Sequence, residues 1–199
     1  MGMSGRWIEA EFEAVFRAHF ERMARMARRV LRSDAEAEEV CAEAFLKLYR
    51  SGPGVAEAGM VGGWLYRTVT RSAIDILRRN RRRGVEEDLD SSDHAPAGSQ
   101  PDDPITRVLR AERIAQVRAA LAAMKPEKAQ LLLLRHSGLS YREIAETLQR
   151  NASSVGTLLA RAEAEFSAIY RKREPRGNSE QSSHPFRPLA RVGKDGAPL

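Results

Sequence analysis

The 199-residue sequence has little of what stabilises small secreted proteins or membrane spans. Cys41 is its only cysteine, which excludes an internal disulfide and a cysteine-based zinc site. The longest apolar runs, Ala119–Met124 and Leu131–Leu134, are far shorter than the roughly 18 residues that a transmembrane helix needs. The first residues show no signal-peptide pattern. We therefore expect a cytoplasmic protein without membrane insertion.

The sequence also lacks the residue patterns of catalytic and metal sites. Its four histidines share no ligand spacing: His19, His94, His136 and His184. There is no recognisable phosphate-binding glycine loop, nucleophile elbow or acid–base pair. We predict a protein that is not an enzyme and that has no catalytic residues, no metal and no cofactor.

Charge is abundant and unevenly distributed. The formal net charge is +6, made up of +5 in residues 1–83, −7 in residues 84–104, +4 in residues 105–170 and +4 in residues 171–199. Two basic units thus flank an acidic strip, an arrangement that fits a protein that binds a polyanion.

Apolar residues recur at intervals of three and four, which predicts an all-α fold of two small helical domains. The first domain, residues 1–83, is predicted to hold helices over 9–31, 34–50 and 63–82. Asp34 is expected to be the N-cap of the second helix, and the Gly-rich stretch up to Gly63 is expected to be a loop or a short helix. The remaining segments are a flexible acidic linker (84–104), a second helical domain (105–170) and a disordered basic tail (171–199).

The second domain contains the pattern of a helix-turn-helix. Ser140 and Glu143 form a capping box that opens a short helix through Leu148, a three-residue turn follows, and a longer helix covers Ala152–Tyr170. In this motif the second helix lies in the major groove of DNA. The predicted duplex-binding residues are at the starts of the two helices: Tyr141, Arg142, Ser153, Ser154, Thr157 and Arg161.

The predicted helix 63–82 carries a stripe of arginines opposite an apolar stripe. Residues 78–83 alone hold five arginines, whereas one or two cations suffice to interact with the negative end of the helix dipole. A guanidinium group can donate two hydrogen bonds to the oxygens of one phosphate, so the cluster indicates phosphate contact. Trp64 and Tyr66 are expected to flank the basic face and to stack on unpaired bases. The residues predicted to contact nucleic acid on this helix are Trp64, Tyr66, Arg67, Arg71, Arg78, Arg79 and Arg82.

The polar side of the predicted helix 34–50 is rich in carboxylates. It is interpreted as a solvated or partner-facing surface. A metal-dependent nuclease site formed by Glu36, Glu39 and Glu43 is the alternative from another functional class.

Three stretches of the chain resemble the bacterial sigma-70 family, and specifically its small two-domain extracytoplasmic-function group. They are residues 34–50, 63–79 and 138–148, which occur in the order and spacing of the family. With their flanks, the similar segments cover about residues 9–170.

The resemblance implies a sigma factor that directs core RNA polymerase to promoters and helps to melt the minus-ten element. Residues 53–83 would bind this element and its unpaired non-template strand, and the second domain would bind the minus-thirty-five element as duplex. The acidic linker would thread through polymerase. Core polymerase would be contacted through Asp34, Glu36, Glu39, Glu43 and Lys47.

One further partner and one alternative function are considered. Whether an anti-sigma factor also binds is left open by the sequence. The alternative is a helix-turn-helix regulator that acts without core polymerase; such proteins usually dimerise, and no strong dimer seam is visible in the sequence.

The sequence departs from the family at four positions. Arg71 stands where asparagine is common, and Gln149 replaces the usual turn glycine, so we expect a backbone cost if Gln149 is left-handed. Gly156 and Leu158 stand where cations are typical. Contacts to the minus-thirty-five element are therefore expected to be weaker or to have a different specificity.

Overall fold

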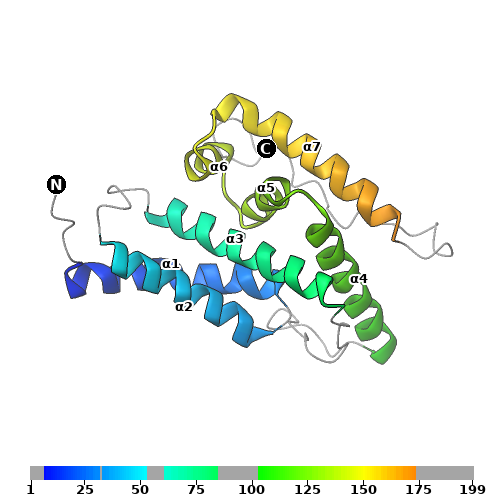
Figure 1. The fold of residues 1–199 in the computed structure, drawn as a ribbon, viewed down its shortest axis with the longest axis horizontal. Coiled ribbons are helices and arrows are strands. Elements are labelled where there is room, and N and C mark those ends of the chain that lie inside the picture. The colour runs from blue at the N-terminus through cyan, green and yellow to red at the C-terminus, as the bar shows by residue number, and fades with distance from the viewer. Residues whose placement is uncertain (1–6, 32, 53–60, 85–102, 174–199) are drawn as a thin grey trace.

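The computed structural model describes residues 7–31, 33–52, 61–84 and 103–173. These residues form seven helices and no strand, which confirms the predicted all-α class (Figure 1). Most of the expected acidic linker and basic tail lies outside the described residues. The helices are α1 (Glu9–Val30), α2 (Asp34–Ser51), α3 (Val61–Arg82), α4 (Pro104–Ala123), α5 (Pro126–His136), α6 (Tyr141–Leu148) and α7 (Ala152–Arg171).

Helices α1, α2 and α3 form the first helical group. Their facing sides bury apolar side chains such as Met23, Phe45 and Leu65, each no more than 3% exposed. Aromatic rings join α1 to α2: the ring of Phe16 meets that of Phe45 edge-on, with the centroids 5.0 Å apart. Trp7 Nε1 donates a hydrogen bond of 3.0 Å to the carbonyl of Leu48, which fixes the chain ahead of α1 on the end of α2.

Two helix starts differ from the prediction. The N-cap of α2 is Ser33, whose hydroxyl accepts a hydrogen bond from the Glu36 backbone N–H at 3.1 Å, so Asp34 is the first helical residue and its charge instead favours the helix dipole. Helix α3 begins at Val61 and includes Gly62 and Gly63, which were expected in a loop or a short helix. Both glycines lie close to side chains of other helices, and such contacts can outweigh the low helix propensity of glycine.

Helices α4 to α7 form the second helical group, and their connections match the predicted motif. Pro126 occupies the first turn of α5. Gly138 has φ +86°, as expected for the left-handed residue that ends α5. The Ser140–Glu143 capping box is present at the start of α6, and Gln149 is left-handed, with φ 53° and ψ 49°. The helix-turn-helix is therefore confirmed.

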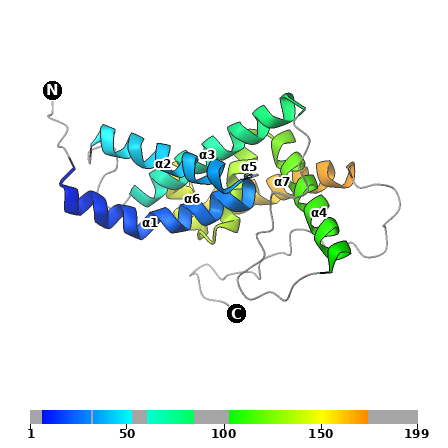
Figure 2. The same cartoon turned by 90° about the horizontal axis from the view of Figure 1, so that it is seen from below.

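The two groups pack against each other, with α3 between them. In Figure 1, α3 runs between the α1–α2 pair and the helices of the second group; Figure 2 shows the same molecule from below. It contacts α1 and α2 on one side and α4, α5 and α6 on the other. Arg118 of α4, only 6% exposed, donates to the carbonyls of Val30 (3.0 Å) and Leu31 at the end of α1. These carbonyls have no partner within α1, so the contact satisfies the helix end.

The left-handed backbone at Gln149 predicts a stabilising substitution. A side chain in this conformation costs about 1 kcal/mol, which glycine avoids, so we expect Gln149→Gly to raise the free energy of unfolding by about 0.5 kcal/mol after its greater chain entropy is deducted. Urea unfolding followed by circular dichroism measures the change. Gln149→Ala is the matched control, because it removes the same exposed side chain but keeps Cβ. Equal unfolding midpoints for the two variants would contradict the assignment of strain.

Candidate nucleic-acid interface

The arginines of α3 lie on the side of the helix that neither core covers. At about 100° per residue, Arg67, Arg71, Arg78 and Arg82 fall within one narrow stripe. Arg71, Arg79 and Arg82 are exposed, whereas Arg67 and Arg78 are partly buried. Arg81, which points from the same last turn, reaches the second group instead: its Nη1 donates to the carbonyl of Ala122 at 3.5 Å. The structure therefore places four of the five predicted arginines along one accessible basic row, and the exposed Arg79 lies about 60° or more round the helix from them.

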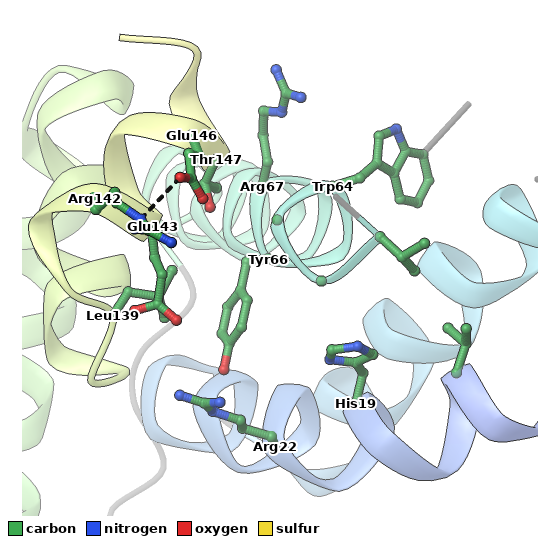
Figure 3. Close-up of a pocket in the computed structure, with 14 residues that line it drawn as sticks. His19, Arg22, Trp64, Tyr66, Arg67, Leu139, Arg142, Glu143, Glu146 and Thr147 are labelled. Carbon is green, nitrogen blue, oxygen red and sulfur yellow. Dashed lines mark ion pairs between the residues drawn. The ribbon is translucent and has the colours of Figure 1, made fainter. Parts of the chain in front are cut away.

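Trp64 and Tyr66 do not flank the same face, contrary to the expectation from sequence. Figure 3 shows the indole of Trp64 directed away from α6, while the ring of Tyr66 points toward Arg22 of α1. Two residues apart on a helix means about 200° of rotation, which separates them. Trp64 shares the side of the arginine row and is partly exposed. Tyr66 is 5% exposed, so in this arrangement its ring cannot stack on a base.

The surroundings of Tyr66 form a site that sequence reasoning missed. The guanidinium carbon of Arg22 lies 5.5 Å from the centroid of the Tyr66 ring, a cation–π contact. Burial raises the pKa of the Tyr66 hydroxyl, with Arg22 acting in the opposite direction. His19 lies nearby on the same helix, and burial together with Arg22 lowers its pKa, which favours a neutral imidazole.

A cavity of about 540 Å³ opens between α1, α3 and α6 (Figure 3). Its walls carry cations on all three helices, namely Arg22, Arg67 and Arg142. They also carry Glu143 and Glu146 of α6, and Glu146 forms an ion pair of 3.3 Å with Arg142. The mixed charge distinguishes this cavity from the row of α3, where the exposed Asp75 is the one acidic side chain of the helix.

The start of α7 presents the predicted duplex-binding residues, although two of their hydroxyls have local partners. Asn151 caps the helix, and its Oδ1 accepts from the Ser153 backbone N–H at 3.1 Å and from the Ser153 hydroxyl at 2.9 Å. The Ser154 hydroxyl donates to the Asn151 carbonyl at 2.7 Å. Thr157 and Arg161, one helical turn apart, are both exposed. They are the members of this set that project freely from α7.

The predicted residues Tyr141 and Arg142 lie in the first turn of α6, and each contacts a neighbouring side chain. Tyr141 is 48% exposed, and the Arg135 guanidinium carbon lies 5.4 Å from its ring centroid. Arg142 is exposed and pairs with Glu146. Hydrogen bonds from the Ser140 backbone N–H and hydroxyl lower the pKa of Glu143, so this carboxylate is committed to capping α6.

Two positions of α7, Gly156 and Leu158, stand where the family typically has cations. A Cβ on Gly156 would lie 3.5 Å from the ring of Tyr141, an ordinary contact distance, so this position faces α6. Leu158 is partly buried against the core. Neither position therefore belongs to the exposed side of α7 that carries Thr157 and Arg161.

The predicted acidic surface of α2 is accessible and contains apolar residues that sequence reasoning missed. Asp34, Glu39, Glu43 and Lys47 are exposed, and Glu36 is partly buried. Glu43 pairs with Lys47 at 3.2 Å. Leu46 and Tyr49 are 45% and 46% exposed on the same helix. Their exposure could have been predicted, because neither residue belongs to the set of apolar positions through which α2 packs into the core.

The described residues contain neither a metal-binding cluster nor a membrane-spanning helix. No three His, Cys, Asp or Glu side chains within them are grouped so that they could hold a metal ion, which leaves the nuclease alternative based on Glu36, Glu39 and Glu43 without a metal site there. None of the described helices combines the length and the apolar character needed to cross a bilayer.

The chain matches two family models in the order that the resemblance implied. Sigma-70 region 2 matches residues 15–83, which include most of α1 and all of α2 and α3. Sigma-70 region 4 matches residues 114–166, which include the helix-turn-helix. The two matches together cover more than half of the sequence, and the chain belongs to the sigma-70 family.

Similar proteins with curated names are ECF RNA polymerase sigma factors of mycobacteria. SigE of Mycolicibacterium smegmatis is 32% identical over 138 residues, which are 69% of this chain and 52% of SigE. SigM of Mycobacterium tuberculosis is 25% identical over 166 residues, 79% of this chain and 76% of SigM. SigG of Mycobacterium tuberculosis is 28% identical over 192 residues, 83% of this chain and 51% of SigG. The chain thus spans about half the length of SigE and SigG.

Proposed function

We propose that this chain is an RNA polymerase sigma factor of the extracytoplasmic-function group. It binds core polymerase in the cytoplasm, directs it to promoters and helps to melt the minus-ten element, without a chemical reaction of its own. The observation that carries the proposal is the basic row of α3 followed in the same chain by a helix-turn-helix, in the order of regions 2 and 4.

The basic row and Trp64 are proposed to hold the opened minus-ten element. Arginines along one side of α3 neutralise consecutive phosphates of the non-template strand, and Trp64, on the same side, offers an aromatic surface to an unpaired base. Such stacking is worth about 1–3 kcal/mol per base. It offsets part of the stacking and pairing energy that is lost when the duplex opens.

The helix-turn-helix is proposed to bind the minus-thirty-five element as duplex. Thr157 and Arg161 project from the exposed side of α7, and Tyr141 and Arg142 lie at the start of α6, where free backbone N–H groups favour a phosphate. Because Gly156 has no side chain and Leu158 is partly buried against the core, few side chains remain to contact bases. The hydroxyls of Ser153 and Ser154 keep lone pairs that can accept hydrogen bonds from base amino groups.

The surface of α2 is proposed to bind core polymerase. Its exposed carboxylates suit a basic partner, and Leu46 and Tyr49 supply the apolar centre that protein interfaces usually contain. Charge around an apolar centre favours fast and specific association.

Removal of the aromatic surface and the first arginine of the row tests strand capture. We expect Trp64→Ala combined with Arg67→Ala to leave affinity for core polymerase unchanged, because both residues are remote from the exposed side of α2. Permanganate footprinting of the promoter should show a several-fold loss of thymine reactivity in the minus-ten element, because the opened strand loses its stacking partner and a phosphate contact. Unchanged promoter opening would contradict the assignment.

Charge reversal at Arg161 tests duplex binding by α7. We expect Arg161→Glu to weaken binding to minus-thirty-five duplex DNA and to reduce the slope of log affinity against log salt by about 1, the share of one phosphate contact. Fluorescence anisotropy over a range of salt concentrations measures both. Arg171→Glu, at the far end of α7, makes the same charge change and should have a smaller effect. If the two variants behave alike at all salt concentrations, Arg161 is not in the interface.

A charge in the apolar centre of α2 tests the polymerase surface. We expect Leu46→Asp to weaken binding to core polymerase by about tenfold or more, since a carboxylate would be desolvated in the complex. Leu109→Asp is the control, because Leu109 is 50% exposed and lies on α4. Biolayer interferometry with immobilised core polymerase compares the two variants. Equal affinities would place the contact elsewhere.

A further inference from the structure

Helix α3 carries one acidic side chain among its arginines, and the neighbouring residues do not account for it. Asp75 is exposed and is the only acidic residue of the helix. Arg71 and Arg79 are each four residues away, a spacing at which opposite charges on a helix commonly pair. Within the described part of the chain, however, the Asp75 carboxylate forms neither an ion pair nor a hydrogen bond. Its oxygens are therefore open to a group from outside the chain.

Neither helix stability nor phosphate binding favours a carboxylate at this position. Carboxylates stabilise a helix from its first turn, whereas Asp75 is the fifteenth of the 22 residues of α3. The carboxylate also repels the phosphates that the arginine row is proposed to bind, so it lowers the affinity of α3 for any DNA strand. A residue that lowers affinity in general can still raise specificity, if it accepts a contact that only some bases offer.

Asp75 lies on the side of α3 from which Trp64 projects. At about 100° per residue, the directions of these two side chains differ by only about 20°, and both lie beside the arginine row. They are about 16 Å apart along the helix axis, so they would face different nucleotides. Thr68 lies between them, and its hydroxyl donates a hydrogen bond of 2.9 Å to the Trp64 carbonyl. Thr68 thus has a local partner, which Asp75 lacks.

The chemistry of a carboxylate limits the bases that it can recognise, because an ionised carboxylate only accepts hydrogen bonds. In the major groove of paired DNA, cytosine presents its N4 amino group with no acceptor of its own beside it. Guanine and thymine present acceptors there, and adenine presents its amino group next to the acceptor N7. In an unpaired strand, guanine also exposes its N2 amino group next to N1–H. Both favourable contacts use an exocyclic amino group.

We propose that Asp75 is a specificity-determining residue for the minus-ten element. Its carboxylate accepts a hydrogen bond from the exocyclic amino group of one base, which is cytosine where the element is paired or guanine where it is open. This inference rests on the proposed function, in which the arginine row holds the same element. The arginines contact phosphates irrespective of sequence, and Asp75 selects among sequences at one position.

Transcription from a promoter library with a randomised minus-ten element tests the proposal. Core polymerase and the full-length chain transcribe the library, and sequencing of barcoded transcripts gives the base preference at each position. We expect the wild type to favour cytosine or guanine by about fivefold or more at one position, and Asp75→Ala to lose this preference while it keeps those at other positions. Glu112→Ala is the matched control, because it removes the same charge from an exposed site on α4 and should keep every preference.

A base analogue then identifies the donor of the hydrogen bond. Pyrimidin-2-one lacks the amino group of cytosine, and hypoxanthine lacks that of guanine. When the analogue replaces the selected base in a fork-junction promoter probe, we expect the wild-type holoenzyme to bind about fivefold more weakly, and the Asp75→Ala holoenzyme to bind both probes equally.

Three outcomes would overturn the role of Asp75: identical base preferences in the wild type and Asp75→Ala, a lost preference for adenine or thymine, or equal binding of both probes by the wild type. The proposed function fails in a different way. If the wild type directs core polymerase to no member of the library, the chain is not a sigma factor, and the inference falls with that function.

Discussion

Helix α3 must satisfy two cores at once while keeping a third side free, and the arrangement of the other helices follows from this constraint. At about 100° per residue, Leu65, Val69 and Ala73 form the side toward α1 and α2. Positions 63, 70, 74 and 77 form a second side, on which Thr70 bonds to Gln130 of α5. The arginine row occupies what remains. A helix divided in this way cannot shift or rotate without disturbing both groups.

The same division explains which features could be predicted from sequence. Local signals act within a few residues: the Ser140–Glu143 capping box and the apolar periods are read directly from the sequence, and the structure confirms them. The side of α3 that meets the second group contains Gly63 and Thr70, so it is less apolar than a core stripe usually is. The spacing of apolar residues therefore predicted only one of the two buried sides of α3.

Long-range polar contacts were even harder to predict from the sequence. Arg118 and Gln130 bond to groups 60 to 88 residues away, and most of the groups that they contact are backbone carbonyls, which every residue has. No residue type marks such an acceptor in advance. The placement of Tyr66 has the same origin, because its burial depends on α1 and α6 being brought together around it. The predictions for Trp64 and the arginines needed only the geometry of their own helix.

Apolar packing provides most of the contact between the two groups. Ile74 and Leu77, on the side of α3 toward the second group, are at most 5% exposed, and one apolar core runs through both groups. Gln130 and Arg118 add hydrogen bonds to backbone carbonyls across the contact. A hydrogen bond contributes only about 1 kcal/mol net, but a buried carbonyl that is left unpaired costs more than that. The apolar side chains therefore supply the attraction between the groups, and the polar side chains fix the orientation in which the groups meet.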